Sequence, residues 1–330
     1  MTQTAPLPTP APTDTGRPSA ARRILRALAV LACLPYISLK IAWIAGSEIG
    51  IPAGSVLLEH RTLLIAANAV TVVMDAAVVV LALLLTRPWG VRVRAWLLAF
   101  PLWAATGLLA PIMIGFPAQI VVSLLAGPQQ TGSREPFLDE WVFGVVYCGF
   151  IIQGLALGTL FVLYVRDRWA HVWCGAVGDL PDRLCGTGTR ATAAVASLLS
   201  LAPAVVHLMW GLDSTRGLSP AQIARRTGDF YVLEWTRALF VAVAVVAVLL
   251  LVVRWARRLS VRTALGLAWI GSGGVGCWGA YMLLVTFMPD TDPAKTFTGL
   301  ARLTYAGEMI TGFLLAGCLA VFLRRRSASA

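Results

Sequence analysis

Ionisable side chains inside apolar runs are the residues of this chain best placed to do chemistry. Lys40, Asp75, His207 and Glu308 all fall within stretches that are otherwise hydrophobic. A charge at the centre of a membrane helix costs about 2.5–3.5 kcal/mol on insertion scales, so such residues typically mark solute pathways, proton relays or ligand counter-ions. These residue types predict binding of a polar solute or ion more directly than they predict a chemical reaction.

Asp75 belongs to a short polar stripe. Asn68, Thr71 and Asp75 are spaced by three and four residues, which places them on one face of a helix. We expect this face to line a ligand or ion pathway. The alternative is structural, with a protonated or hydrogen-bonded Asp75 holding a neighbouring helix.

Lys40 and Glu308 are expected at about the same depth in the first and last apolar runs, with His207 in the same layer. A Lys40–Glu308 ion pair would explain two costly charges at one depth and would join the first helix to the last. The alternative for Lys40 is a side chain that extends to the membrane surface without pairing.

The composition predicts the transmembrane helices that position these residues. The 330 residues are 58% hydrophobic and 13% charged, and apolar runs of about 20 residues, long enough to cross a bilayer, occur eight times. Continuous apolar runs exclude a membrane β-barrel, whose strands alternate. The expected spans are 24–45, 62–86, 95–116, 141–165, 191–211, 233–253, 263–288 and 301–323.

Charge distribution predicts the orientation. The net charge of +11 does not indicate nucleic-acid binding, because the arginines lie in short clusters between apolar runs. Most of the 27 Lys and Arg fall on one side of the predicted membrane, and most acids fall on the other. The positive-inside rule therefore places both termini in the cytoplasm of a bacterial cell, with the chain in the inner membrane.

The sequence pattern indicates an internal duplication. A shift of 167 residues pairs Lys40 with His207 and Trp43 with Trp210. Further aromatic and Gly matches follow in the same order along the chain. The predicted fold class is all-α, a polytopic transmembrane bundle of about eight helices built as two tandem four-helix repeats. The predicted segments are a disordered tail 1–23, a first membrane unit 24–165, a cytoplasmic loop 166–190, a second unit 191–323 and a basic tail 324–330.

The duplication makes the polar stripe asymmetric. Residues at the positions matching Asn68, Thr71 and Asp75 are Trp235, Ala238 and Ala242. We therefore expect the stripe in the first unit only, as for one specialised site.

Pro and Gly interrupt the third and seventh apolar runs. Thr106, Gly107 and Pro111 match a region containing Ser272 and Gly273. Broken helices at matching places in two repeats indicate a transporter site, whereas close packing through small residues is the structural alternative. Residues 116–127 are expected to form an interfacial or re-entrant stretch.

Several kinds of catalytic and cofactor-binding site are not expected, because the residues that they need are missing from the sequence. The chain has no HExxH or CxxC motif, and its three His include two in predicted loops, so no metal or cofactor is expected. Ser272 is not followed by a histidine base. Asp290 and Asp292 form a weak acidic pair that resembles the metal-binding pair of some glycosyltransferases, with a solvated turn as the alternative.

The Lys40/His207-x2-Trp segments at 40–50 and 207–217 resemble the opening signature of uncharacterised actinobacterial four-helix membrane proteins. That resemblance implies a membrane fold and no activity. Three functions remain open: a small-solute or ion permease-like protein, a non-catalytic scaffold or accessory subunit, and a membrane enzyme acting on lipid-linked substrates. The expected partners are the lipid bilayer, a small solute or ion, and a partner membrane protein.

Overall fold

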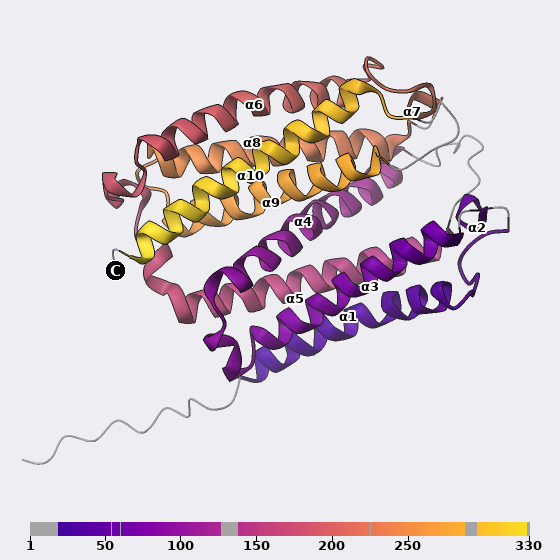
Figure 1. The fold of residues 1–330 in the computed structure, drawn as a ribbon, viewed down its shortest axis with the longest axis horizontal. Helices are drawn as coiled ribbons and strands as arrows, with labels where there is room; N and C mark the ends of the chain where they lie inside the picture. Colours follow the sequence, from indigo (N-terminus) through magenta and orange to yellow (C-terminus); the bar gives the residue numbers. More distant parts are fainter. Residues whose placement is uncertain are drawn as a thin grey trace, which may run out of the picture.

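The computed structural model describes residues 19–53, 55–59, 61–126, 138–224, 226–287 and 296–328. Eight long helices dominate these residues, and each is long and apolar enough to cross a bilayer (Figure 1). They are α1 (Ala20–Ile44), α3 (Arg61–Leu84), α4 (Ala95–Ala126), α5 (Glu140–Trp173), α6 (Thr187–Gly211), α8 (Gly228–Val253), α9 (Val261–Val285) and α10 (Gly299–Ser327). The all-α prediction is confirmed.

Short elements connect the long helices. They are the helices α2 (Val56–Glu59) and α7 (Pro220–Ala224), and the 3-10 turns η1 (Pro88–Arg92), η2 (Val177–Asp179) and η3 (Asp182–Leu184). The start of α1 and the end of α10 lie on one side of the bundle, here called the terminal side (Figure 1). The helices α2 and α7 lie on the opposite side.

The signature at the ends of α1 and α6 builds the same turn twice. The Trp43 indole donates to the Ile49 carbonyl over 2.8 Å, and the Trp210 indole donates to the Arg216 carbonyl over 2.9 Å. The next residues, Gly50 and Gly217, have φ of +75° and +76°, a backbone region that favours glycine. The shared motif therefore terminates a helix in each case.

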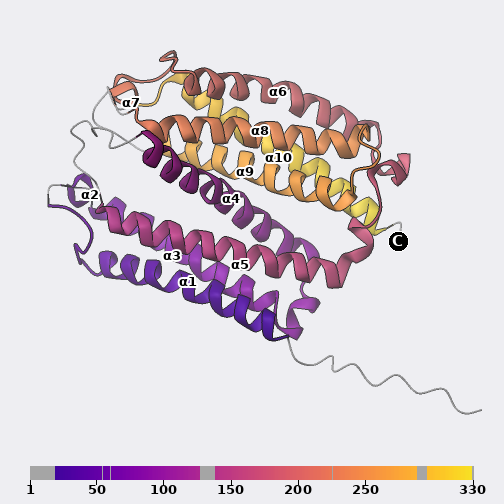
Figure 2. The same ribbon diagram turned by 180° about the vertical axis from the view of Figure 1, so that it is seen from behind.

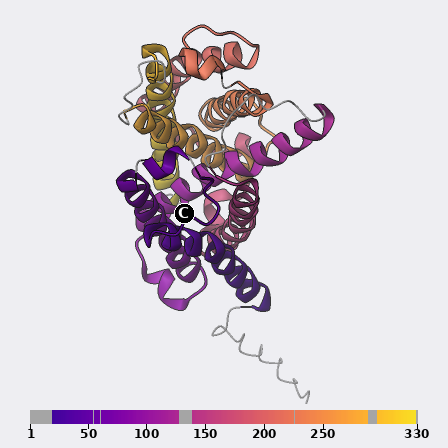
Figure 3. The ribbon, with the colours of Figure 1, turned by 90° about the vertical axis from the view of Figure 1, so that its right-hand side faces the viewer.

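The helices form two groups with α4 between them. The helices α6, α8, α9 and α10 pack together, while α1 packs against α3 and α5. In Figures 1 and 2, α4 crosses obliquely between the groups. It packs along α9, α5 and α8 and makes only a marginal contact with α3. Figure 3 views the bundle from the side opposite the termini, with the two groups one above the other. The tandem duplication stays a prediction.

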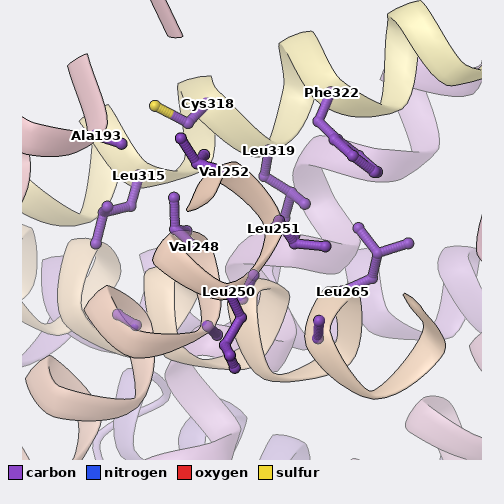
Figure 4. Packing of buried hydrophobic residues seen from close by; sticks show 14 of the residues in the cluster. Ala193, Val248, Leu250, Leu251, Val252, Leu265, Leu315, Cys318, Leu319 and Phe322 are labelled. Atoms are coloured by element: carbon purple, nitrogen blue, oxygen red, sulfur yellow. The ribbon is translucent and has the colours of Figure 1, made fainter. Parts of the chain in front are cut away.

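The larger hydrophobic cluster lies among α6, α8, α9 and α10, towards the terminal side. Figure 4 shows part of it, where Leu251 of α8, Leu265 of α9 and Leu315 of α10 come from different helices. A smaller cluster joins α1, α3, α5 and the start of α4, including Leu102 and Leu160. The second group therefore has the more extensive hydrophobic core.

The prediction that Pro and Gly break two helices is wrong. Helix α4 runs without interruption through Pro101, Pro111 and Pro117, and α9 runs through its Gly-rich stretch. Residues 116–126 continue α4 and do not form a re-entrant segment. Proline is tolerated inside membrane helices because neighbouring groups and local adjustments satisfy the freed backbone carbonyls.

Boundaries differ from the predicted ones mainly on the terminal side. Helix α5 continues to Trp173, with a kink at Trp169, and α6 already begins at Thr187. The predicted 166–190 loop is therefore partly helical. Helix α10 extends to Ser327, into the predicted basic tail. The predicted disordered tail falls almost entirely outside the described residues.

Candidate functional site

Lys40 forms an ion pair with Asp75 between α1 and α3. Its Nζ lies 2.7 Å from Asp75 Oδ2, and the exposed fractions of the two side chains are 1% and 9%. The ammonium also lies 3.5 Å from the centre of the Tyr36 ring, a cation–π contact. The expected Lys40–Glu308 pair is wrong, because each of these residues has other partners. Lys40 does not extend to the membrane surface either, because it is almost fully buried.

A second buried network joins α6, α8 and α10. His207 Nδ1 lies 2.5 Å from Glu234 Oε2, and His207 Nε2 lies 3.0 Å from Glu308 Oε1. The second contact has the distance of an ion pair without the alignment of a good hydrogen bond. Arg237 Nη1 then donates to the other Glu308 oxygen over 3.2 Å. His207 and Glu308 are therefore neighbours, although Lys40, expected in the same layer, pairs with Asp75 instead.

Aromatic rings surround the guanidinium of this network. Arg237 lies 5.2 Å from the centre of the Tyr305 ring and 5.9 Å from that of the Trp278 ring. Ring faces attract cations, and they do so more strongly away from water. The network is thus held by a carboxylate on one side and by π systems on the other.

Both charged clusters open into one cavity of about 980 Å³. Its walls come from α1, α3, α4, α5, α8, α9 and α10, and most of its lining is apolar or aromatic. The charged lining residues among those described are Lys40, Asp75, Glu234, Arg237 and Glu308. Binding sites for small molecules have this size and character, concave and mainly apolar with a few convergent polar groups.

The position of α4 explains why the space exists. Gly107 of α4 meets Gly273 of α9 so closely that an added Cβ would lie 2.4 Å from backbone atoms. The Trp103 indole also donates to Ser272 Oγ over 3.1 Å at this crossing. Close backbone approach through small residues is the usual packing mode of membrane helices. It holds α4 against the second group and leaves room beside α3.

The structure brings together some of the predicted site residues. Lys40, Thr71, Asp75, Pro111 and Glu308 all line the cavity. The remaining residues lie elsewhere: Asn68 donates to the Leu64 carbonyl, His207 is fully buried behind two carboxylates, Thr106 donates to the Leu102 carbonyl, and Gly107, Ser272 and Gly273 lie at the α4–α9 crossing.

Sequence reasoning missed two members of the site. Glu234 is not among the residues that the sequence singled out, yet it is 5% exposed within α8, and Arg237 lies one turn further along the same helix. Neither residue occupies a position that matches Asn68, Thr71 or Asp75, so the expectation that the polar stripe belongs to the first unit stays a prediction. The i, i+3 spacing of an acid and an Arg inside an apolar run was the available signal.

Asp290 and Asp292 lie outside the described residues, so the acidic-pair hypothesis stays a prediction. Within the described ranges, no group of three or more His, Cys, Asp or Glu side chains could hold a metal ion. No family model matches the chain, and no curated protein or solved structure is significantly similar to it. The fold therefore gives the class of the protein, although no family is assigned: the chain is a multi-pass integral membrane protein.

Proposed function

We propose that this protein is a permease-like membrane protein that binds a small solute in the cavity between α3 and α4. The observation that carries the proposal is a cavity of about 980 Å³ into which both buried charge clusters open. A solute reaching it would meet Lys40 and Asp75 on one wall and Glu234, Arg237 and Glu308 on another. In this proposal both termini are cytoplasmic, as the arginine distribution indicates.

Energetics favour a ligand site over a purely structural role. Replacing a buried ion pair by well-packed apolar residues is often neutral or stabilising, so buried pairs alone do not explain their presence. A scaffold that only needed stability would gain from filling the space with side chains. The cavity together with five charged residues at its wall is what a solute site requires and a scaffold does not.

Native mass spectrometry of the detergent-purified protein tests this proposal. Ala77 and Ala76 are neighbours on α3, and only Ala77 lines the cavity. We expect a co-purifying small molecule with the wild type and with Ala76→Trp, and its loss from folded Ala77→Trp, because the indole fills the site. Bare protein in all three samples would favour the scaffold reading, and the next search would be for a partner membrane protein.

A further inference from the structure

The contacts of His207 require one proton more than a neutral imidazole and two ionised carboxylates carry together. Both ring nitrogens face carboxylate oxygens, at 2.5 Å from Glu234 and 3.0 Å from Glu308. A neutral imidazole has a single N–H, so one of these contacts would bring two lone pairs together. An imidazolium, or one protonated carboxyl group, removes that conflict.

Charge balance points to the same extra proton. In the cavity wall Lys40 offsets Asp75, and Arg237 offsets one of the two glutamates. One negative charge is left, and the proton of the His207 network neutralises it. An uncompensated charge buried in a membrane protein is costly, so one further positive charge has to lie beside the two glutamates.

The groups that face His207 are those of the two helices packed against α6. Helix α8 presents Glu234 and α10 presents Glu308 to the imidazole, while Arg237 pairs with Glu308 and lies against the Tyr305 ring. Glu234 and Glu308 line the cavity, whereas His207 lies behind them. A ligand can therefore approach the carboxylates directly and affect the proton only through them.

From this arrangement we infer that the cavity binds an apolar monovalent organic cation and releases the proton of the His207 network when it does so. The cation supplies the one positive charge, and the proton leaves to solvent, so the net charge of the site is unchanged. The aromatic lining, including Tyr147 and Phe150, favours an organic cation through cation–π contacts and apolar burial. This inference rests on the proposed solute site and specifies its substrate class.

Isothermal titration calorimetry with two ions of matched size tests the inference. Tetraphenylphosphonium and tetraphenylborate have nearly the same shape and opposite charges, and empty micelles correct for partitioning. We expect the cation to bind the wild type at least about tenfold more tightly than the anion. Titrations in buffers of different ionisation enthalpy should show release of about one proton for each bound cation.

Variants assign the proton and the counter-charge. His207→Gln shows which group holds the proton: loss of proton release in this variant assigns the proton to the imidazole, and release that persists assigns it to a carboxyl group. Glu234→Gln should weaken cation binding about tenfold. Asp213→Asn, an exposed acid outside the cavity, should behave as wild type.

Three results would overturn the inference: equal binding of both ions, cation binding without proton release by the wild type, or no cation binding. If the cation does not bind while native mass spectrometry still finds a neutral ligand that Ala77→Trp excludes, only the cation inference fails. If Ala77→Trp changes neither binding nor co-purification, the solute site itself fails.

Discussion

The Lys40–Asp75 pair offers a quantitative test of the buried site through a double-mutant cycle. Lys40→Met and Asp75→Asn each leave the partner charge uncompensated in a nearly dry environment. Removing one member of a buried pair costs about 3–5 kcal/mol, whereas removing both is often close to neutral. Because Asp75 lines the cavity, some hydration of the remaining charge is available, so we expect each single change to cost about 3 kcal/mol.

In the double variant we expect a cost of about 1 kcal/mol or less, so the coupling energy, the sum of the single costs minus the double cost, should be at least about 5 kcal/mol. Unfolding by SDS titration in mixed micelles, followed by circular dichroism, measures these free energies. Arg254 and Asp182 provide the matched control, since they pair on the terminal side with Asp182 83% exposed. Their coupling energy should stay below about 1 kcal/mol. Additive effects of Lys40→Met and Asp75→Asn would refute the pairing.

Three further predictions concern the crossing of α4 and α9 and the loop after α5. Gly107→Leu should destabilise the protein by about 3 kcal/mol, because its side chain meets the α9 backbone, whereas Gly158→Leu, which faces open space, should have little effect in the same SDS titration. Ser272→Ala should cost about 1 kcal/mol there through the lost indole hydrogen bond. Burial raises the pKa of the Cys185 thiol and lowers its thiolate fraction, so maleimide should label exposed Cys174 faster at pH 7. Labelling of Cys185 should become faster as the pH is increased. Peptide mapping by mass spectrometry measures both rates, and equal rates would contradict the burial of Cys185.

Apolar run length was enough to predict the helices, because a membrane span needs about 20 apolar residues whatever its neighbours are. Lys40, Asp75 and Glu308 were predictable as buried ions for the same reason, since a charge inside such a run is conspicuous. Their pairing was not. Depth along a helix suggested that Lys40 meets Glu308, whereas the choice of partner depends on which helices are adjacent, and α1 packs against α3.

Glu234 and Arg237 were missed for a related reason. The predicted span begins at residue 233, so an acid at its edge resembles a surface group, whereas α8 begins at Gly228 and buries it. The proline-rich α4 was misjudged because a proline removes one backbone hydrogen bond but does not end a helix that its neighbours support. The structure instead has close packing of Gly107 on Gly273, which was the structural alternative to broken helices in that region.

The central claim is that a solute occupies the cavity between α3 and α4, in contact with its charged wall. Electron cryomicroscopy of the full chain in lipid nanodiscs tests it most directly. The account predicts a non-protein density in the cavity, within hydrogen-bonding distance of Asp75, Glu234 or Glu308. Helices α3 and α4 packed directly together, with no space between them, would contradict it.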